Sequence, residues 1–293
     1  MAHLARILVP IDFSDHSVTA AQHAGALARR FHSEVVLLHV NEFPAAYPLA
    51  GPLGFGITST EAEQAEQVER RRKQLEEFGA NELSGLPVKR VIRSGDPAEL
   101  IVECARAEKS DLILMPTRGY GVFRRFLLGS VTAKVLHDAE CPVWTGVHLA
   151  DSSPVDLAEV RLVMCAVDFG PESIKAIRWA ADFASEFDAK LAVVHTVVDA
   201  PPNLPERYMF QWHEEAHWGA EERLRILLLD SGIHAEILVV SDGDIPKSIS
   251  QAAVDKGAQL LVIGRCCEGH PEKRLGAHTL ATICQAPCPV VSV

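Results

Sequence analysis

The first half of the chain alternates between short apolar runs and longer segments in which apolar residues recur at helical spacing. The runs predict five strands, and the segments between them predict connecting helices. We expect strands at 6–11, 34–40, 88–92, 112–115 and 142–146, a helix capped by Ser14 that reaches Phe31, and helices at 60–79, 97–109 and 130–138. Because the strands lack a half-exposed alternation and are joined by helices, they indicate a parallel sheet covered on both faces.

The second half of the chain repeats the first. Residues 6–40 align with residues 162–196 without a gap, so that Asp12 meets Asp168 and His39 meets His195. Later matches keep the same order: GDPAELI at 95–101 with GDIPKSI at 243–249, and CPVW at 141–144 with CPVV at 288–291. This repetition predicts two copies of one domain, at 1–150 and 158–293, joined by a polar linker near Asp151. The predicted fold class is α/β, with two repeated doubly wound domains, each a five-stranded, mainly parallel sheet.

Charge and composition narrow the possible functions. The formal net charge of −11 is carried mainly by residues 151–293, which disfavours a nucleic-acid partner. No apolar run is long enough to span a membrane, and the start of the chain lacks the apolar core of a signal peptide. We therefore expect a cytoplasmic protein whose seven cysteines are reduced thiols.

The segment MPTRGYGVFRRFLLGS, residues 115–130, follows a predicted strand and opens a predicted helix. Its glycines allow close backbone approach, the free N–H groups of a helix start attract anions, and the hydroxyls of Ser130 and Thr132 add donors. Arginines at 118, 124 and 125 supply positive charge. The segment matches neither a Walker A loop nor the dinucleotide motif. On these residues alone, it is either a phosphate site or a solvated turn.

The combined pattern resembles the universal stress protein family in a tandem two-domain form. The pattern has an Asp after the first strand, a Val at the end of the second, a G-x2-G-x9-G-[ST] segment, and CPV in the last strand. The resemblance implies an adenine nucleotide alpha hydrolase-like fold and, in the ATP-binding kind of member, ATP in the first copy, with Mg as the only accompanying metal. By resemblance, Asp12 contacts the ribose, Met115 flanks the sugar, and the adenine and phosphate positions are lined by Pro10, Ile11, Val40, Pro116, Arg118, Gly119, Gly129, Ser130, Val131 and Thr132.

Both copies depart from that family pattern. Pro116 replaces the first glycine and removes one N–H donor, which predicts a weakened or altered site rather than a lost one. In the second copy, Gly264-Arg265-Cys266-Cys267 stands where P-T-R-G stands, and the serine at the helix start is missing. Glu268 and Glu272 place negative charge where phosphates would lie. We expect this copy to serve architecture or a different ligand.

Three other signals suggest chemistry. His213-Glu214-Glu215-Ala216-His217 matches the zinc-protease motif, but it lies in a polar helix without a third ligand, and Trp212 and Trp218 are interpreted as flanking packing residues. The cluster of Cys266, Cys267, His270, Cys284 and Cys288 lacks zinc-site spacing, so buried or loop thiols are expected, with redox sensing or metal binding as alternatives. His39 and His195 lie in apolar strands, which favours hydrogen-bonded, pocket-shaping histidines over acid–base groups.

These observations predict a non-enzymatic stress-response regulator or adaptor that binds ATP or a related adenine nucleotide in the first copy. Two alternatives stay open: a nucleotide-free interaction module, and a slow ATPase or metal-dependent hydrolase. The last strands, PVWTGV and PVVSV, are apolar and would lie at sheet edges, where they invite pairing. They predict an internal pairing of the two copies, and we further expect a homodimer of chains, a protein partner, and neither a nucleic-acid nor a membrane partner.

Overall fold

The computed structural model describes residues 4–41, 61–117, 128–146, 160–198, 200–201, 205–241, 243–265 and 276–293. The first half contains β1 (Arg6–Ile11), α1 (Asp15–Phe31), β2 (Glu34–Asn41), α2 (Glu61–Glu77), β3 (Val88–Ser94), α3 (Pro97–Ala107), β4 (Leu112–Leu114), α4 (Ser130–Asp138) and β5 (Val143–Thr145). The second half contains β6 (Leu162–Ala166), α5 (Ser173–Glu186), β7 (Lys190–Thr196), α6 (Glu206–Ser231), β8 (Glu236–Val240), α7 (Ile245–Lys256), β9 (Leu260–Ile263), α8 (Ala277–Gln285) and β10 (Val290–Ser292). The predicted elements of the first half are confirmed, with ends that differ by a few residues.

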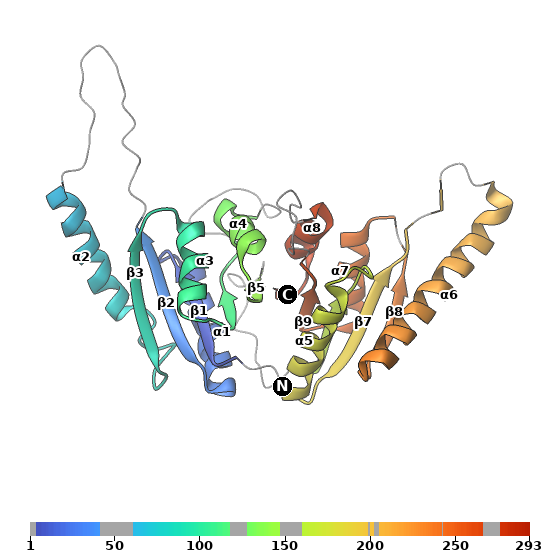
Figure 1. Cartoon of the computed structure of the whole chain (residues 1–293), viewed down its shortest axis with the longest axis horizontal. Coiled ribbons are helices and arrows are strands. Elements are labelled where there is room, and N and C mark those ends of the chain that lie inside the picture. Colours follow the sequence, from blue (N-terminus) through green and yellow to red (C-terminus); the bar gives the residue numbers. More distant parts are fainter. Residues whose placement is uncertain are drawn as a thin grey trace, which may run out of the picture.

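The ten strands of the described residues form one sheet in the order β3-β2-β1-β4-β5-β10-β9-β6-β7-β8. Within each half, every pairing is parallel, and β5 and β10 pair antiparallel at the centre. The predicted internal pairing of the last strands is therefore confirmed. It also removes both strands from the sheet edge, because the edges are now β3 and β8. Figure 1 shows the halves side by side, with α2 and α6 at opposite ends.

Helices cover both faces of this sheet. On one face, α1, α2, α5 and α6 pack into a core that includes Ile7, Val9 and Val193. On the other face, α3, α4, α7 and α8 pack into a second core that includes Leu8, Val36 and Leu261. Neighbouring residues of one strand thus enter different cores, which is why both faces of the strands had to be apolar.

The same local devices begin corresponding helices in both halves. The side chain of Asp96 accepts a hydrogen bond from the N–H of Glu99 at the start of α3, where a proline occupies the first turn. Asp244 caps α7 in the same way by accepting from the N–H of Lys247. Ser14 caps α1, as the sequence predicted, by accepting from the N–H of Ser17. These caps explain why the helix starts could be placed from residue type.

An aromatic cluster joins the two halves beside the β5–β10 pair. Phe183 of α5 is fully buried, and its ring lies 5.8 Å from that of Trp144 in β5 and 6.0 Å from that of Phe31 in α1. Within the second half, the ring of Trp179 stacks on Phe183 at 5.2 Å, and Phe187 lies 4.8 Å away. Side chains from both halves therefore share one core at this point.

Among the described residues, no helix is both long and apolar enough to cross a membrane.

Candidate functional site

The strand order places a topological switch point between β1 and β4. From β1 the chain moves outward through β2 to β3, and then returns to the other side of β1 as β4. Ligands of open α/β sheets bind beyond the carboxyl ends of strands at such a point. The predicted site residues that the structure describes lie at this edge, on β1, β2, the exit of β4 or the start of α4: Pro10, Ile11, Asp12, Val40, Met115, Pro116, Gly129, Ser130, Val131 and Thr132. The predicted Arg118 and Gly119 lie outside the described residues.

Asp12 follows β1 directly and is held by two serines. Its Oδ1 accepts hydrogen bonds from the hydroxyl of Ser14 at 2.5 Å and the hydroxyl of Ser17 at 2.6 Å, and from the N–H of Ser14 at 3.0 Å. Burial by itself raises the pKa of Asp12, but these hydrogen bonds outweigh it and hold the pKa below its usual value. Asp12 is therefore an oriented carboxylate anion at neutral pH, which suits it to accept a hydrogen bond from a ligand hydroxyl.

A second fixed group lies beside Asp12. The Nδ1 atom of His39 is 3.0 Å from the carbonyl oxygen of Ile11, and burial lowers the pKa of His39, so its imidazole is neutral near pH 7. Phe13 packs on His39 with a ring distance of 4.5 Å, adopts φ of 65°, and lies under the guanidinium of Arg71. The expected hydrogen bond of His39 is confirmed, and its role in shaping a pocket stays a prediction.

Sequence reasoning missed Phe13 as part of this group. The signal was available, because the Asp-Phe pair recurs as Asp168-Phe169, and Phe169 also adopts positive φ and packs on His195 at 4.3 Å. A non-glycine residue in this backbone region is uncommon, and its presence in both halves indicates a turn that is kept for its geometry. Phe13 therefore belongs to the framework that orients Asp12.

The start of α4 is the other half of the candidate site. Gly129 is the N-cap residue and makes no side-chain cap, so the first N–H groups of α4 lack the hydrogen bond that a capping side chain would accept. The N–H of Gly129 donates to the carbonyl oxygen of Thr117 at 2.9 Å, which fixes this helix end beside the exit of β4. An uncapped helix start fixed at a strand exit is a favourable place for an anion.

The hydroxyl of Thr132 forms a hydrogen bond within the protein. Thr132 is buried, and its hydroxyl donates to the carbonyl oxygen of Pro116 at 3.1 Å. This hydroxyl therefore has a partner within the protein, and its role as a phosphate donor stays a prediction. Pro116 has no N–H to donate, but its carbonyl oxygen accepts this hydrogen bond and so links the exit of β4 to the first turn of α4.

The second half keeps this framework but changes its charges. Asp168 accepts from the N–H of Gly170 at 2.8 Å and from the hydroxyl of Ser173 at 3.2 Å. Glu172 lies at the exit of β9, where a Cβ added to Gly264 would come within 3.3 Å of the Cβ of Glu172. The carboxylate of Glu172 pairs with Lys175 at 3.8 Å. The acidic residues 268 and 272, which the sequence suggested would repel phosphate, lie outside the described residues.

Arg265 stands at the position that Thr117 holds in the first half. It is buried, and its guanidinium donates to the carbonyl oxygens of Leu136 at 2.9 Å and Cys141 at 2.6 Å. Leu136 lies in the last turn of α4, so the cation of the second half satisfies the carboxyl end of a first-half helix. The positive charge in the altered loop is thus used to join the halves.

The structure describes the zinc-protease motif and part of the cysteine cluster that the sequence singled out. His217 of the zinc-protease motif contacts the hydroxyl of Ser241 at 3.3 Å, and no cluster of three metal-ligating side chains occurs in the part of the chain that the structure describes. Trp218 is 70% exposed, so its interpretation as a packing residue is wrong. Cys288 is buried and Cys284 lies in α8, as expected, whereas Cys266, Cys267 and His270 lie outside the described residues.

Known proteins supply an independent comparison. A model described as the universal stress protein family matches residues 3–145 and, a second time, residues 159–293. This chain belongs to the universal stress protein family. The two matches show a tandem arrangement of the family's unit, in agreement with the internal repeat.

Individual universal stress proteins agree with this assignment. One from Methanocaldococcus jannaschii is 34% identical over 140 residues, which cover 47% of this chain and 79% of that protein. One from Mycobacterium tuberculosis is 25% identical over 268 residues, which cover 88% of this chain and 86% of that protein. The crystal structure of a universal stress protein from Archaeoglobus fulgidus has a TM-score of 0.72 at 20% identity and covers 99% of this chain and 98% of that one. At that identity, the structural likeness shows the fold.

Proposed function

We propose that the first half of this universal stress protein binds ATP or a related adenine nucleotide, and that the bound nucleotide changes how the protein acts as a stress-response regulator or adaptor. The observation that carries the proposal is the pairing of two groups at one switch point. An oriented Asp12 carboxylate ends β1, and the uncapped start of α4 is fixed at the exit of β4. A nucleotide needs both an acceptor for ribose hydroxyls and a donor set for phosphate oxygens.

The assignment of residues follows from their positions. Asp12 accepts from the ribose, Met115 flanks the sugar, and Pro10, Ile11 and Val40 supply apolar contacts to adenine. The N–H groups of α4 that follow Gly129 donate to phosphate, together with Arg118 and Gly119. The resemblance to ATP-binding family members supports this assignment through the spacing of Gly119, nine residues and Gly129-Ser130, although Pro116 replaces the first glycine. A Mg ion that accompanies ATP would supply charge neutralisation and would depend on phosphate oxygens rather than on a ligand cluster of the chain.

The second half is not part of the proposed nucleotide site. Its arginine at the exit of β9 is directed to α4, and Ala277 stands at the helix start where the first half has Ser130. We propose that this half contributes architecture through the continuous sheet. Domain limits of 1–150 and 158–293, a homodimer of chains and a cytoplasmic location remain predictions of the sequence.

Calorimetric titration of ATP tests the proposal, after any co-purified nucleotide has been released by denaturation and identified. Gly129→Glu places a carboxylate at the start of α4, where it repels phosphate and occupies the free N–H groups. We expect about tenfold or greater weakening. Gly129→Gln is the uncharged control. Gly276→Glu is the matched control, because Gly276 holds the same N-cap position at the start of α8. We expect it to leave ATP affinity unchanged, because the proposed site lies in the first half.

The outcomes separate the alternatives. No binding of ATP to the folded wild type would favour the nucleotide-free interaction module. Equal binding to wild type and Gly129→Glu would refute the position of the site. Release of phosphate above the buffer background, lost in Asp12→Asn, would favour the slow ATPase, which otherwise has no general base that we can assign.

A further inference from the structure

Exposed apolar side chains are concentrated on helix α6. Of the eight large hydrophobic residues that are exposed in the described chain, six belong to this helix: Tyr208, Met209, Phe210, Trp218, Ile226 and Leu229. Its counterpart α2 exposes charged and amide side chains together with Ala65 over its described residues 65–77, and no large hydrophobic one. Because the same helix of the same fold is polar in one half and apolar in the other, the fold does not require the apolar surface of α6.

Four residues of α6 form one stripe along the helix. Trp218, Glu222, Arg225 and Leu229 follow one another at intervals of four, three and four residues, so they fall within about 60° around the helix axis. Trp218 is 70% exposed and Leu229 is 72% exposed. The residues of α6 that are buried in the core lie on another side of the helix: Ala220, Leu224 and Leu228. The stripe therefore faces away from the core.

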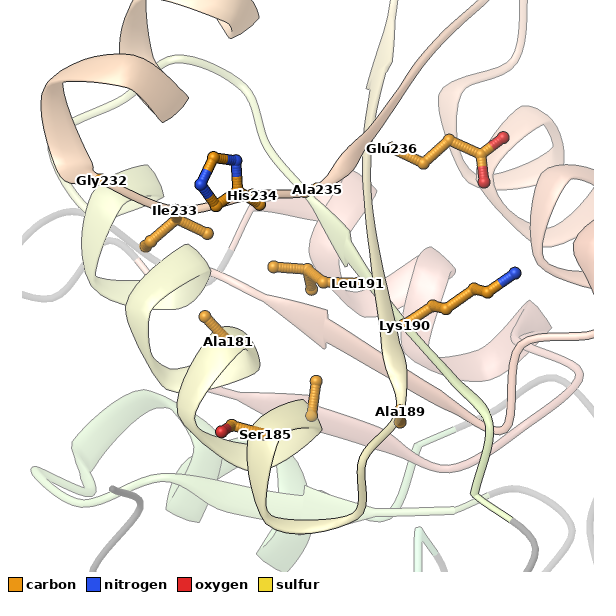
Figure 2. Close-up of a pocket in the computed structure, with 11 residues that line it drawn as sticks. Ala181, Ser185, Ala189, Lys190, Leu191, Gly232, Ile233, His234, Ala235 and Glu236 are labelled. Atoms are coloured by element: carbon orange, nitrogen blue, oxygen red, sulfur yellow. The ribbon is translucent and has the colours of Figure 1, made fainter.

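The stripe is separate from the cleft at the end of α6. In the first half, the connection of residues 78–87 places Leu83, which is 3% exposed, against α1. In the second half, the connection is only residues 232–235, and it leaves a cleft of about 600 Å³ that Ala181 and Leu191 line, as Figure 2 shows. None of the four stripe residues lines this cleft, so the two surfaces are distinct.

The stripe is apolar at both ends and ionic in the middle. Within the helix, Arg225 pairs with Glu222 at 2.5 Å and with Glu221 at 2.7 Å. If two copies of α6 lie antiparallel about a two-fold axis between residues 223 and 224, Trp218 faces the partner's Leu229 and Glu222 faces the partner's Arg225, and each contact occurs twice. If one helix slides by about one turn, Glu222 faces the partner's Glu222, or Arg225 faces the partner's Arg225. One register therefore matches both the apolar and the charged positions.

The surroundings of α6 favour a second copy over a membrane. Figure 1 places α6 at one end of the molecule, and no other labelled helix or strand lies beyond it. The helix carries six Asp or Glu residues and three Arg residues, so its net charge is −3. Helices that lie on membranes carry Lys and Arg on their polar face, because lipid surfaces are anionic.

We propose that this stripe is the contact surface of a homodimer in which the α6 helices of two chains pack antiparallel. The join between the halves offers a precedent, because there the corresponding strands β5 and β10 also pair antiparallel. The stripe spans only about 16 Å of the helix, which is less than a standard interface needs, so we expect a dissociation constant of about 1–100 μM. The proposal does not depend on nucleotide binding, and it gives the homodimer expected from the sequence a defined surface.

Sedimentation velocity on a concentration series of the full-length protein tests the proposal. We expect a reversible equilibrium between monomer and dimer in wild type. Leu229→Asp should weaken the dimer about tenfold or more, because the two-fold axis loses the apolar contact at both ends of the stripe. Phe210→Asp is the matched control and should dimerise as wild type does, because Phe210 is 73% exposed on the same helix but lies outside the stripe. Circular dichroism and the melting temperature show that each variant is folded, and Trp218→Ala is the second stripe variant if Leu229→Asp is unfolded.

A charge exchange between chains makes the test specific. Glu222→Arg places two arginines opposite each other, and Arg225→Glu places two glutamates opposite each other, so each variant alone should dimerise about tenfold more weakly. A mixture of the two variants restores opposite charges at both contacts and should form a heterodimer about as strong as the wild-type dimer. Because the exchange takes place between chains, the loss of an ion pair within one helix cannot produce this recovery.

Three results would overturn the proposal. The first is a wild type that stays monomeric up to about 500 μM, well above the expected dissociation constant. The second is a dimer that folded Leu229→Asp and Trp218→Ala leave unchanged, because the chains would then associate through another surface. The third is a mixture of Glu222→Arg and Arg225→Glu that associates no more than either variant alone.

Discussion

Truncation of Phe183 to alanine tests whether the two halves share one core. Phe183 belongs to the second half, and its ring contacts Trp144 and Phe31 of the first half and Trp179 and Phe187 of its own half. The ring is fully buried in a core cluster that contains side chains of both halves. The substitution therefore removes contacts on both sides of the junction at once.

The expected loss follows from the burial and from the ring contacts. Replacement of a buried phenylalanine with alanine costs about 3–5 kcal/mol of unfolding free energy, including the cavity that remains. Aromatic pairs contribute about 0.5–1.5 kcal/mol each beyond their buried area, so we expect Phe183→Ala to lie toward the upper end, at about 4–5 kcal/mol. For a chain of this size, that loss corresponds to a fall in Tm of roughly 10 °C.

Urea unfolding followed by tryptophan fluorescence and by far-ultraviolet circular dichroism measures this loss. Phe210→Ala is the matched control, because Phe210 is 73% exposed and its truncation should change stability by about 0.5 kcal/mol or less. We expect both probes to report one transition in wild type, since one sheet and one core cluster extend through both halves. A loss as small as that of Phe210→Ala, or separate transitions of the two halves in wild type, would refute the shared core.

Three further predictions follow from buried polar groups. Arg265→Met removes two charge-assisted hydrogen bonds and leaves two carbonyl groups unpaired, so urea unfolding should show a loss of about 3–5 kcal/mol, and Arg265→Lys should recover only part of it. Burial raises the pKa of the Cys165 thiol and raises that of Cys288 to about 12, so peptide mapping after treatment with a thiol reagent at pH 8 should find both unmodified in native protein and modified in urea. Burial lowers the pKa of His39 below its unfolded value of about 6.5, so the unfolded state binds more protons as pH falls through this window, and the unfolding free energy should decrease between pH 7.5 and 5.5. The decrease should be smaller in His39→Gln, and an unchanged pH dependence would contradict this assignment.

Several features of the fold could be read from the sequence for specific physical reasons. Unbroken apolar strands require cover on both faces, and Ser14 and Asp96 are residue types that cap helices, so the strands and helix starts were predictable from residue type. The Asp-Phe pair and the histidine of the second strand recur in both halves, and so does the geometry around them. The switch-point edge was predictable for the same reason, because parallel strands with helical connections place their carboxyl ends together.

Other features depend on distant residues that meet only in the folded chain. The sequence predicted a donor hydroxyl at Thr132, but the carbonyl of Pro116 accepts that proton across the loop. Trp218 is a large apolar residue, so the sequence predicted that it packs in the interior, yet its side chain is exposed on α6. Arg265 stands in an altered ligand loop, and only the antiparallel β5–β10 pairing brings it to Leu136 in the other half.

The sequence by itself determined two copies of an α/β unit and the edge at which a ligand would lie. Hydrophobic periodicity and helix caps depend on neighbouring residues, and the repeat is found by aligning the chain with itself. The tertiary structure decided how the copies join and how each hydrogen-bond donor is used. It also decided which surface a short connection leaves open: Leu83 covers α1, and the corresponding surface of α5 has no such cover from the described residues. These outcomes depend on contacts between residues far apart in the chain, and such contacts leave no periodic signal in either partner.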